Sequence, residues 1–128
     1  LEESGEKKID EGIDVEFVGI INYGIIALIQ VELNDDDNVD LSTDVAVALY
    51  EKKVQETRTL MLKKNHDYGE AWRDMRPSSF TDLILTKLMR LKQIEDNQGQ
   101  TIISEGPSSH YMDIVNYAVF ALIKMSEA

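Results

Sequence analysis

The fold is decided by a stretch near the end of the chain, EGPSSHYMDIVNYAVFALIK, residues 105–124. Residues 11–30, EGIDVEFVGIINYGIIALIQ, align with it at a constant offset of 94 without a gap. Eight of the twenty aligned pairs are identical, where chance would give about one. The two stretches are therefore predicted to be equivalent helices of an internal repeat, and the second helix is expected to run to about Met125.

The remaining sequence predicts further helices, because it contains only two prolines and seven glycines. Residues 14–32 place apolar side chains nearly all round a helix, which is therefore expected to be largely buried. A second helix should run from the N-cap candidates at 42–44 to about residue 64, and a third from Pro77 to about residue 95. Residues 65–75 read as a connection. The pattern predicts an all-α bundle of about four long helices with little or no sheet.

The repeat also predicts the domain organisation of residues 1–128, a single all-α domain. Residues 44–128 form a complete repeat, residues 34–43 an acidic linker, and residues 1–33 the second half of a degenerate first repeat. On this interpretation the chain is a fragment or trimmed product of a two-repeat protein. The alternative, a short protein with a fortuitous similarity between two helices, stays open.

The composition excludes several classes of protein. The chain has 128 residues, of which 43% are hydrophobic, so general disorder is excluded. The absence of cysteine excludes a disulfide scaffold, a thiol nucleophile and a cysteine-ligated zinc site. No unbroken run of about eighteen apolar residues occurs, which argues against a membrane-spanning helix and a membrane partner. With no signal peptide pattern at the start, the expected compartment is the cytoplasm.

The charge balance bears on the choice of ligand. A formal net charge of −11 disfavours a nucleic-acid polymer, because such a surface repels a phosphate backbone. A small phosphorylated substrate remains compatible with this charge, since clustered carboxylates can hold Mg²⁺, which then neutralises the phosphates.

The candidate site residues all lie in the complete repeat. Glu56 and Asp67 are eleven residues apart and share a helix face, and Lys87 and Arg90 are neighbours on the next helix. Asp113 and Asn116 lie on one stripe of the last helix, with Glu105 just upstream. Acidic oxygens facing cations are what a metal–nucleotide requires. The same residues could instead cap turns or form structural ion pairs, and the aromatic residues Tyr68, Trp72, Tyr111 and Tyr117 could stack a base or build core.

Three spaced motifs resemble a known family. Lys64-Asn65-His66-Asp67-Tyr68-Gly69, Lys87-x-x-Arg90 and Glu105-x7-Asp113-x-x-Asn116-Tyr117-Ala118 resemble the nucleotide-modification-associated domain of bacteria and phages. That domain is in turn similar to the MazG-type all-α nucleoside triphosphate pyrophosphatases. The resemblance implies a MazG-like helical fold and Mg²⁺-dependent hydrolysis of a nucleoside triphosphate, or of a modified nucleotide, to the monophosphate and pyrophosphate.

The resemblance also implies roles for individual residues. Catalysis would fall to Asp67, Glu105 and Asp113, and these three with Glu56 would hold Mg²⁺. The nucleotide substrate would be bound by Lys64, Tyr68, Lys87, Arg90 and Asn116. Ser109 and Thr86 stand where many relatives have an acid. This departure favours the alternative function, a non-catalytic helical module for nucleotide sensing or protein interaction.

A homodimer is expected from the first helix. Without neighbours equivalent to those of the last helix, residues 14–31 would expose an apolar patch larger than soluble monomers usually show. A second copy would cover this patch, with Val18, Ile21, Ile25 and Leu28 at the interface.

Overall fold

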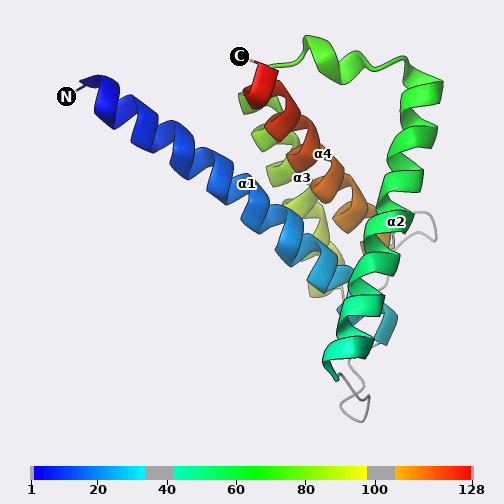
Figure 1. Ribbon diagram of the computed structural model, residues 1–128. Coiled ribbons are helices and arrows are strands. Elements are labelled where there is room, and N and C mark those ends of the chain that lie inside the picture. The colour runs from blue at the N-terminus through cyan, green and yellow to red at the C-terminus, as the bar shows by residue number, and fades with distance from the viewer. Residues whose placement is uncertain (1, 34–41, 98–105, 128) are drawn as a thin grey trace.

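Four long helices account for nearly all of the computed structural model, which describes residues 2–33, 42–97 and 106–127 (Figure 1). A short 3₁₀ helix, η1, joins the second and third of them. In chain order the elements are α1 (Glu2–Leu33), α2 (Thr43–Tyr68), η1 (Ala71–Asp74), α3 (Pro77–Asp96) and α4 (Pro107–Glu127). No strand occurs in these three ranges, so the prediction of an all-α fold with four long helices is confirmed.

Two helices are longer than the sequence predicted. α1 begins at Glu2 rather than near residue 14, because residues 2–11 are rich in glutamate and lysine, which are good helix formers. α2 continues to Tyr68, four residues beyond the predicted end, and stops at Gly69. Gly69 takes the left-handed conformation (φ 65°), and its N–H donates to the carbonyl of Asn65. The motif of residues 64–68 is therefore helical rather than part of a connection.

α4 is the central helix of the fold. Figure 1 shows α1 and α4 side by side and running in opposite directions, and α3 also packs against α4. Phe80 and Ile84 of α3 join Ile114, Ala118 and Ala121 of α4 in the larger buried cluster, which also takes in Phe17 and Trp72. Ile25, Leu28 and Val115 form a second cluster between α1 and α4. The side chains of α4 are thus held between two helices.

Gly24 lies at a close approach of α1 to α4. A Cβ atom at this position would lie 2.5 Å from Cγ2 of Val115, far inside van der Waals contact. Gly24 therefore lets the two backbones pack directly against each other.

α1 is not largely buried, and the expectation that it would be is wrong. Val15, Val18, Tyr23 and Ile26 are exposed, because α4 covers one face of α1 and α2 crosses only its C-terminal half (Figure 1). Ile25 and Leu28, expected at a homodimer interface, are each 1% exposed within this chain. They pack against Val115, so their assignment to an interface is also wrong.

The two equivalent asparagines of the proposed repeat both contact α2. The Tyr50 hydroxyl donates to Oδ1 of Asn22 over 2.7 Å, and Nδ2 of Asn116 donates to the carbonyl of Thr57 over 3.4 Å. Asn116 is buried and Asn22 is exposed. The positions are therefore related but the surroundings differ, and the repeat architecture stays a prediction.

The segment Gly12–Leu33 of α1 is long and apolar enough to cross a membrane, by length and composition alone. The argument from sequence against such a helix is therefore wrong. That argument required an unbroken run of apolar residues. A few polar residues scattered through the segment interrupt such a run but do not lower its mean hydropathy enough to exclude a membrane span. The core helix of a globular protein meets the same criterion, and this segment supplies the face that packs on α4.

Candidate functional site

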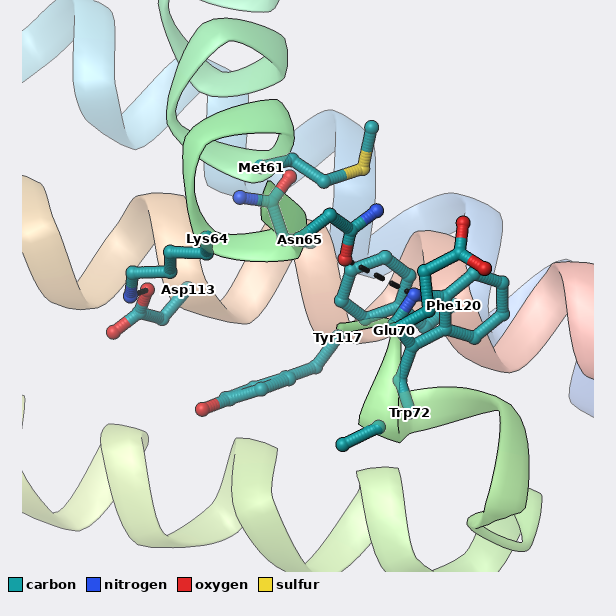
Figure 2. Close-up of a pocket in the computed structure, with 10 residues that line it drawn as sticks. Met61, Lys64, Asn65, Glu70, Trp72, Asp113, Tyr117 and Phe120 are labelled. Carbon is teal, nitrogen blue, oxygen red and sulfur yellow. Dashed lines mark hydrogen bonds and ion pairs between the residues drawn. The ribbon is translucent and has the colours of Figure 1, made fainter. Parts of the chain in front are cut away.

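The centre of the candidate site is the carboxylate of Asp113, in the N-terminal half of α4. Nζ of Lys64, from α2, lies 2.6 Å from one carboxylate oxygen, and Nζ of Lys87, from α3, lies 3.0 Å from the other. Figure 2 shows the Lys64 ammonium directly beside the Asp113 carboxylate. One acidic side chain of α4 therefore contacts both α2 and α3.

The charges at this point favour an anionic ligand. The Asp113 side chain is only 10% exposed, whereas those of Lys64 and Lys87 are 45% and 27% exposed. A nearly buried carboxylate requires partners of opposite charge, and here it has two. Asp113, Lys64 and Lys87 together carry one positive charge, in a chain whose net charge is −11. The two ammonium groups are the more exposed members of this cluster.

A pocket of about 200 Å³ opens next to Lys64 and Asp113. We call it the aromatic pocket. Its lining consists of Met61, Lys64, Asn65, Glu70, Ala71, Trp72, Asp113, Asn116, Tyr117 and Phe120. Figure 2 shows the charged pair at one end of the labelled residues and Glu70, Trp72 and Phe120 at the other. The pocket is thus charged at one end and mostly aromatic at the other.

The aromatic side chains of this pocket differ in what they can bind. Trp72 stacks on Phe120 with ring centroids 4.5 Å apart, and the Arg73 guanidinium lies 4.5 Å over the Trp72 ring. Both faces of the indole are therefore covered, and its Nε1 donates to Oδ1 of Asn65 over 3.1 Å. Trp72 forms a wall of the pocket and has no face left to stack a base.

Tyr117 is a half-buried aromatic residue in the lining of the aromatic pocket. Burial raises the pKa of the Tyr117 phenol, and the negative charge of Asp113 raises it further, against an opposing effect of Lys64. The phenol is therefore neutral at physiological pH and can act as a hydrogen-bond donor or acceptor.

A second pocket, of about 370 Å³, lies beside Lys87 and is lined mainly by residues of α3. We call it the α3 pocket, and its lining consists of Thr86, Lys87, Met89, Arg90, Gln93 and His110. Lys87 lines this pocket and also bonds to Asp113, which lines the aromatic pocket. One ion pair therefore links a residue of each pocket, and Arg90 adds a second positive charge to the α3 pocket.

The structure brings together most of the residues that the sequence proposed for substrate binding. Lys64 and Asn116 line the aromatic pocket, and Lys87 and Arg90 line the α3 pocket. The side chain of Tyr68 lies outside the described part of the structure. The four described residues come from three helices, and two of them, Lys64 and Lys87, contact Asp113.

The proposed acidic residues are not brought together in the same way. Asp67 is exposed and lines neither pocket. Glu56 lies 3.1 Å from Nζ of Lys53, which also contacts Glu32 of α1 at 2.9 Å. Glu56 and Asp67 do share a helix face, but eleven residues of helix separate them by about 16 Å along the axis. Glu105 lies outside the described residues.

The described residues of the site do not fit a bound Mg²⁺ ion. No group of three or more histidine, aspartate or glutamate side chains that could hold a metal ion occurs within residues 2–33, 42–97 and 106–127. Both carboxylate oxygens of Asp113 are occupied by ammonium groups, and these would repel a divalent cation.

Glu70 is a pocket residue that the sequence analysis did not single out. It has a left-handed backbone (φ 57°, ψ 36°) directly after the left-handed Gly69. Two successive residues of this kind reverse the chain at the end of α2 and bring Glu70 to the pocket. The signal available in the sequence was only that Glu70 follows a helix-ending glycine.

Comparison with known proteins places this all-helical domain and its site in a family. The family model described as Nucleotide modification associated domain 1 matches residues 1–31 and 64–125. The chain therefore belongs to that family. The two matched segments end 94 residues apart, which is the offset of the internal similarity. No curated protein and no solved structure matches the chain.

Proposed function

We propose that this domain binds a nucleotide, with its phosphates at Lys64 and Lys87 and its base in the aromatic pocket. The observation that carries the proposal is the meeting of two lysines from separate helices at one nearly buried carboxylate, between two pockets. Membership of a nucleotide-associated family supports a ligand of this kind.

The hydrogen-bonding capacity of the lysines supports phosphate binding. Each ammonium group has three donors, and Asp113 accepts one from each. The remaining donors can bind phosphate oxygens, while Asp113 keeps both side chains extended towards the same point. Holding the lysines in place in advance lowers the entropy that a ligand must overcome to order them.

The size of the site supports a ligand with more than one part. Pockets for drug-sized ligands measure about 300–1,000 Å³, and the aromatic pocket alone, at about 200 Å³, is smaller. Together with the α3 pocket of about 370 Å³ the site reaches this range. A base in the aromatic pocket and a chain of phosphates passing Lys87 towards Arg90 would use both.

Hydrolysis of a nucleoside triphosphate is the second candidate function. It is favoured by the position of Asp113, a carboxylate at the phosphate end of the site, on the helix that Glu105 closely precedes in sequence. In this reaction a water oxygen bonds to the α-phosphorus, the bond from that phosphorus to the α–β bridging oxygen breaks, and the monophosphate and pyrophosphate leave. Because the described residues do not fit Mg²⁺, a metal-dependent reaction would need ligands from outside them.

The single tryptophan provides a direct test of nucleotide binding, because Trp72 lines the aromatic pocket. Ribo- and deoxyribonucleoside mono-, di- and triphosphates are titrated while Trp72 fluorescence is followed, and a saturable change is expected. Lys64→Gln or Lys87→Gln should weaken binding about tenfold or more, the effect of losing a charged hydrogen bond. The matched controls are Lys63→Gln and Lys92→Gln, since both lysines are exposed on the same helices and line neither pocket.

Measuring pyrophosphate release in the same nucleotide mixtures separates the two candidate functions. Pyrophosphate release that requires added Mg²⁺ would support hydrolysis, and saturable binding without release would support a binding module. The proposal of nucleotide binding fails if no nucleotide gives a saturable signal. It also fails if the control variants lose as much affinity as the pocket variants, because the effect would then be one of general charge.

A further inference from the structure

Glu70 places a negative charge in the aromatic pocket, at the end away from the lysines. Figure 2 shows the Glu70 carboxylate beside Phe120, with Lys64 and Asp113 on the opposite side of the labelled group. A ligand whose phosphates lie at Lys64 would therefore direct its base towards Glu70. The two ends of the pocket have opposite charge and would recognise different parts of one ligand.

The Glu70 carboxylate is held in position by Arg73. Nε of Arg73 lies 2.9 Å from Oε2 of Glu70, and Nη1 of Arg73 lies 3.2 Å from Oε1 of Glu127 at the end of α4. Arg73 also lies over the Trp72 ring. The first of these contacts occupies Oε2 of Glu70, and within the described residues Oε1 has no hydrogen bond or ion pair. One carboxylate oxygen of Glu70 can therefore accept a hydrogen bond from a ligand.

The backbone at Glu70 also points to a role beyond the local turn. Its φ of 57° is the only positive φ of a non-glycine residue among the described residues. A side chain in this conformation is disfavoured relative to glycine, and such residues gather at ligand-binding sites. At this position the backbone favours glycine, but glycine has no side chain. Glutamate instead places a carboxylate in the wall of the pocket.

We infer that the base bound in the aromatic pocket carries an exocyclic amino group that donates a hydrogen bond to Glu70. This inference rests on the proposed nucleotide binding. A cytosine- or adenine-type base presents an amino group at its edge, which a carboxylate accepts well. A uracil-type base presents a carbonyl oxygen at the same place, and two acceptors facing each other in a pocket repel and remain unpaired.

Two pairs of nucleotides test the inference, because each pair differs in this edge. CTP and UTP differ at position 4 of the pyrimidine, and ATP and ITP differ at position 6 of the purine, where an amino group is replaced by a carbonyl oxygen. Dissociation constants are measured by Trp72 fluorescence and by equilibrium dialysis. In the unmodified chain the amino-bearing member of at least one pair should bind about tenfold more tightly.

The variant Glu70→Gln should reduce that ratio to about threefold or less, because an amide can turn to present either a donor or an acceptor. Glu127→Gln is the matched control, since it removes the other carboxylate that contacts Arg73 but does not line the pocket, and it should leave the ratio unchanged. Circular dichroism confirms that both variants fold.

The outcomes distinguish this inference from the proposed function. Equal binding within both pairs, or a preference that persists in Glu70→Gln, would overturn the inference and leave nucleotide binding standing. Absence of any saturable binding, for all four nucleotides by both methods, would overturn both.

Discussion

The close approach of α1 and α4 at Gly24 makes Gly24→Ala the most direct test of the fold. The new methyl group would lie 2.5 Å from Cγ2 of Val115, 4.0 Å from Cβ of Val115 and 3.9 Å from the carbonyl oxygen of Tyr111. Val115 is 4% exposed, and valine in a helix has one strongly preferred rotamer. The valine cannot turn away at little cost, so the helices must separate.

The expected magnitude follows from two opposing effects. Forcing an extra methyl group into a packed core costs about 1–3 kcal/mol, and alanine is favoured over glycine inside a helix by about 1 kcal/mol. Gly24→Ala should therefore lower the free energy of unfolding by up to about 2 kcal/mol. The matched control is Gly19→Ala in the same helix, where no atom lies within 4 Å of the new methyl group. Gly19→Ala should raise the free energy of unfolding by up to about 1 kcal/mol.

Urea denaturation followed by far-ultraviolet circular dichroism measures both variants. A third variant, Gly24→Ala with Val115→Ala, removes the clash and should be less destabilised than the sum of the two single substitutions. If Gly24→Ala stabilises the chain as much as Gly19→Ala does, α1 and α4 do not pack through this glycine. The core described above would then be wrong.

Three further predictions concern the charged and titrating groups. Asp113→Asn should lower the free energy of unfolding, measured by urea denaturation, by about 2 kcal/mol, because it removes the negative charge that pairs with Lys64 and Lys87. An unchanged free energy of unfolding would show that these ion pairs contribute nothing to stability. Absorbance titration of tyrosinate should show one phenol ionising above the usual pKa of 10, since burial raises the pKa of Tyr117, and Tyr117→Phe should remove that step. The stabilisation from the neutral phenol is present below the unfolded pKa and lost as pH rises through the folded one. Hydrogen bonds from Lys52 and Lys53 lower the pKa of Glu32 below 4.5, so its contribution to stability is present above the unfolded pKa and lost as pH falls through the lowered one. Glu32→Gln should therefore make the stability less dependent on pH as the pH falls below 4.5, and an unchanged dependence would show that this ion cluster does not form.

Much of the fold could be predicted from the sequence because helices depend on local features. Pro77 begins α3 as expected, and the apolar spacing predicted all four long helices. The residues around which the site forms, Lys64, Lys87 and Asp113, could also be named, because their motifs resemble those of a family whose model matches the chain.

The distances between these residues could not be predicted, because they depend on how the helices cross. The sequence indicated Asp113 as a metal ligand, whereas the structure gives its carboxylate two lysine partners from different helices. Helical periodicity placed Glu56 and Asp67 on one face but carries no information about which neighbouring helix each would meet. In the structure Glu56 pairs with Lys53, which also pairs with Glu32 of α1.

The sequence by itself determined that the chain forms four long helices, and its motifs named Lys64, Lys87 and Asp113, since helical patterns and short motifs depend on residues close together in the chain. Only the tertiary structure decided that α1 has one exposed apolar face and that Glu70 enters the aromatic pocket. The exposure of α1 depends on how many helices cover it, and the position of Glu70 depends on two left-handed residues that reverse the chain. Both features depend on how segments far apart in the sequence pack together. A local sequence pattern gives no distance between such segments.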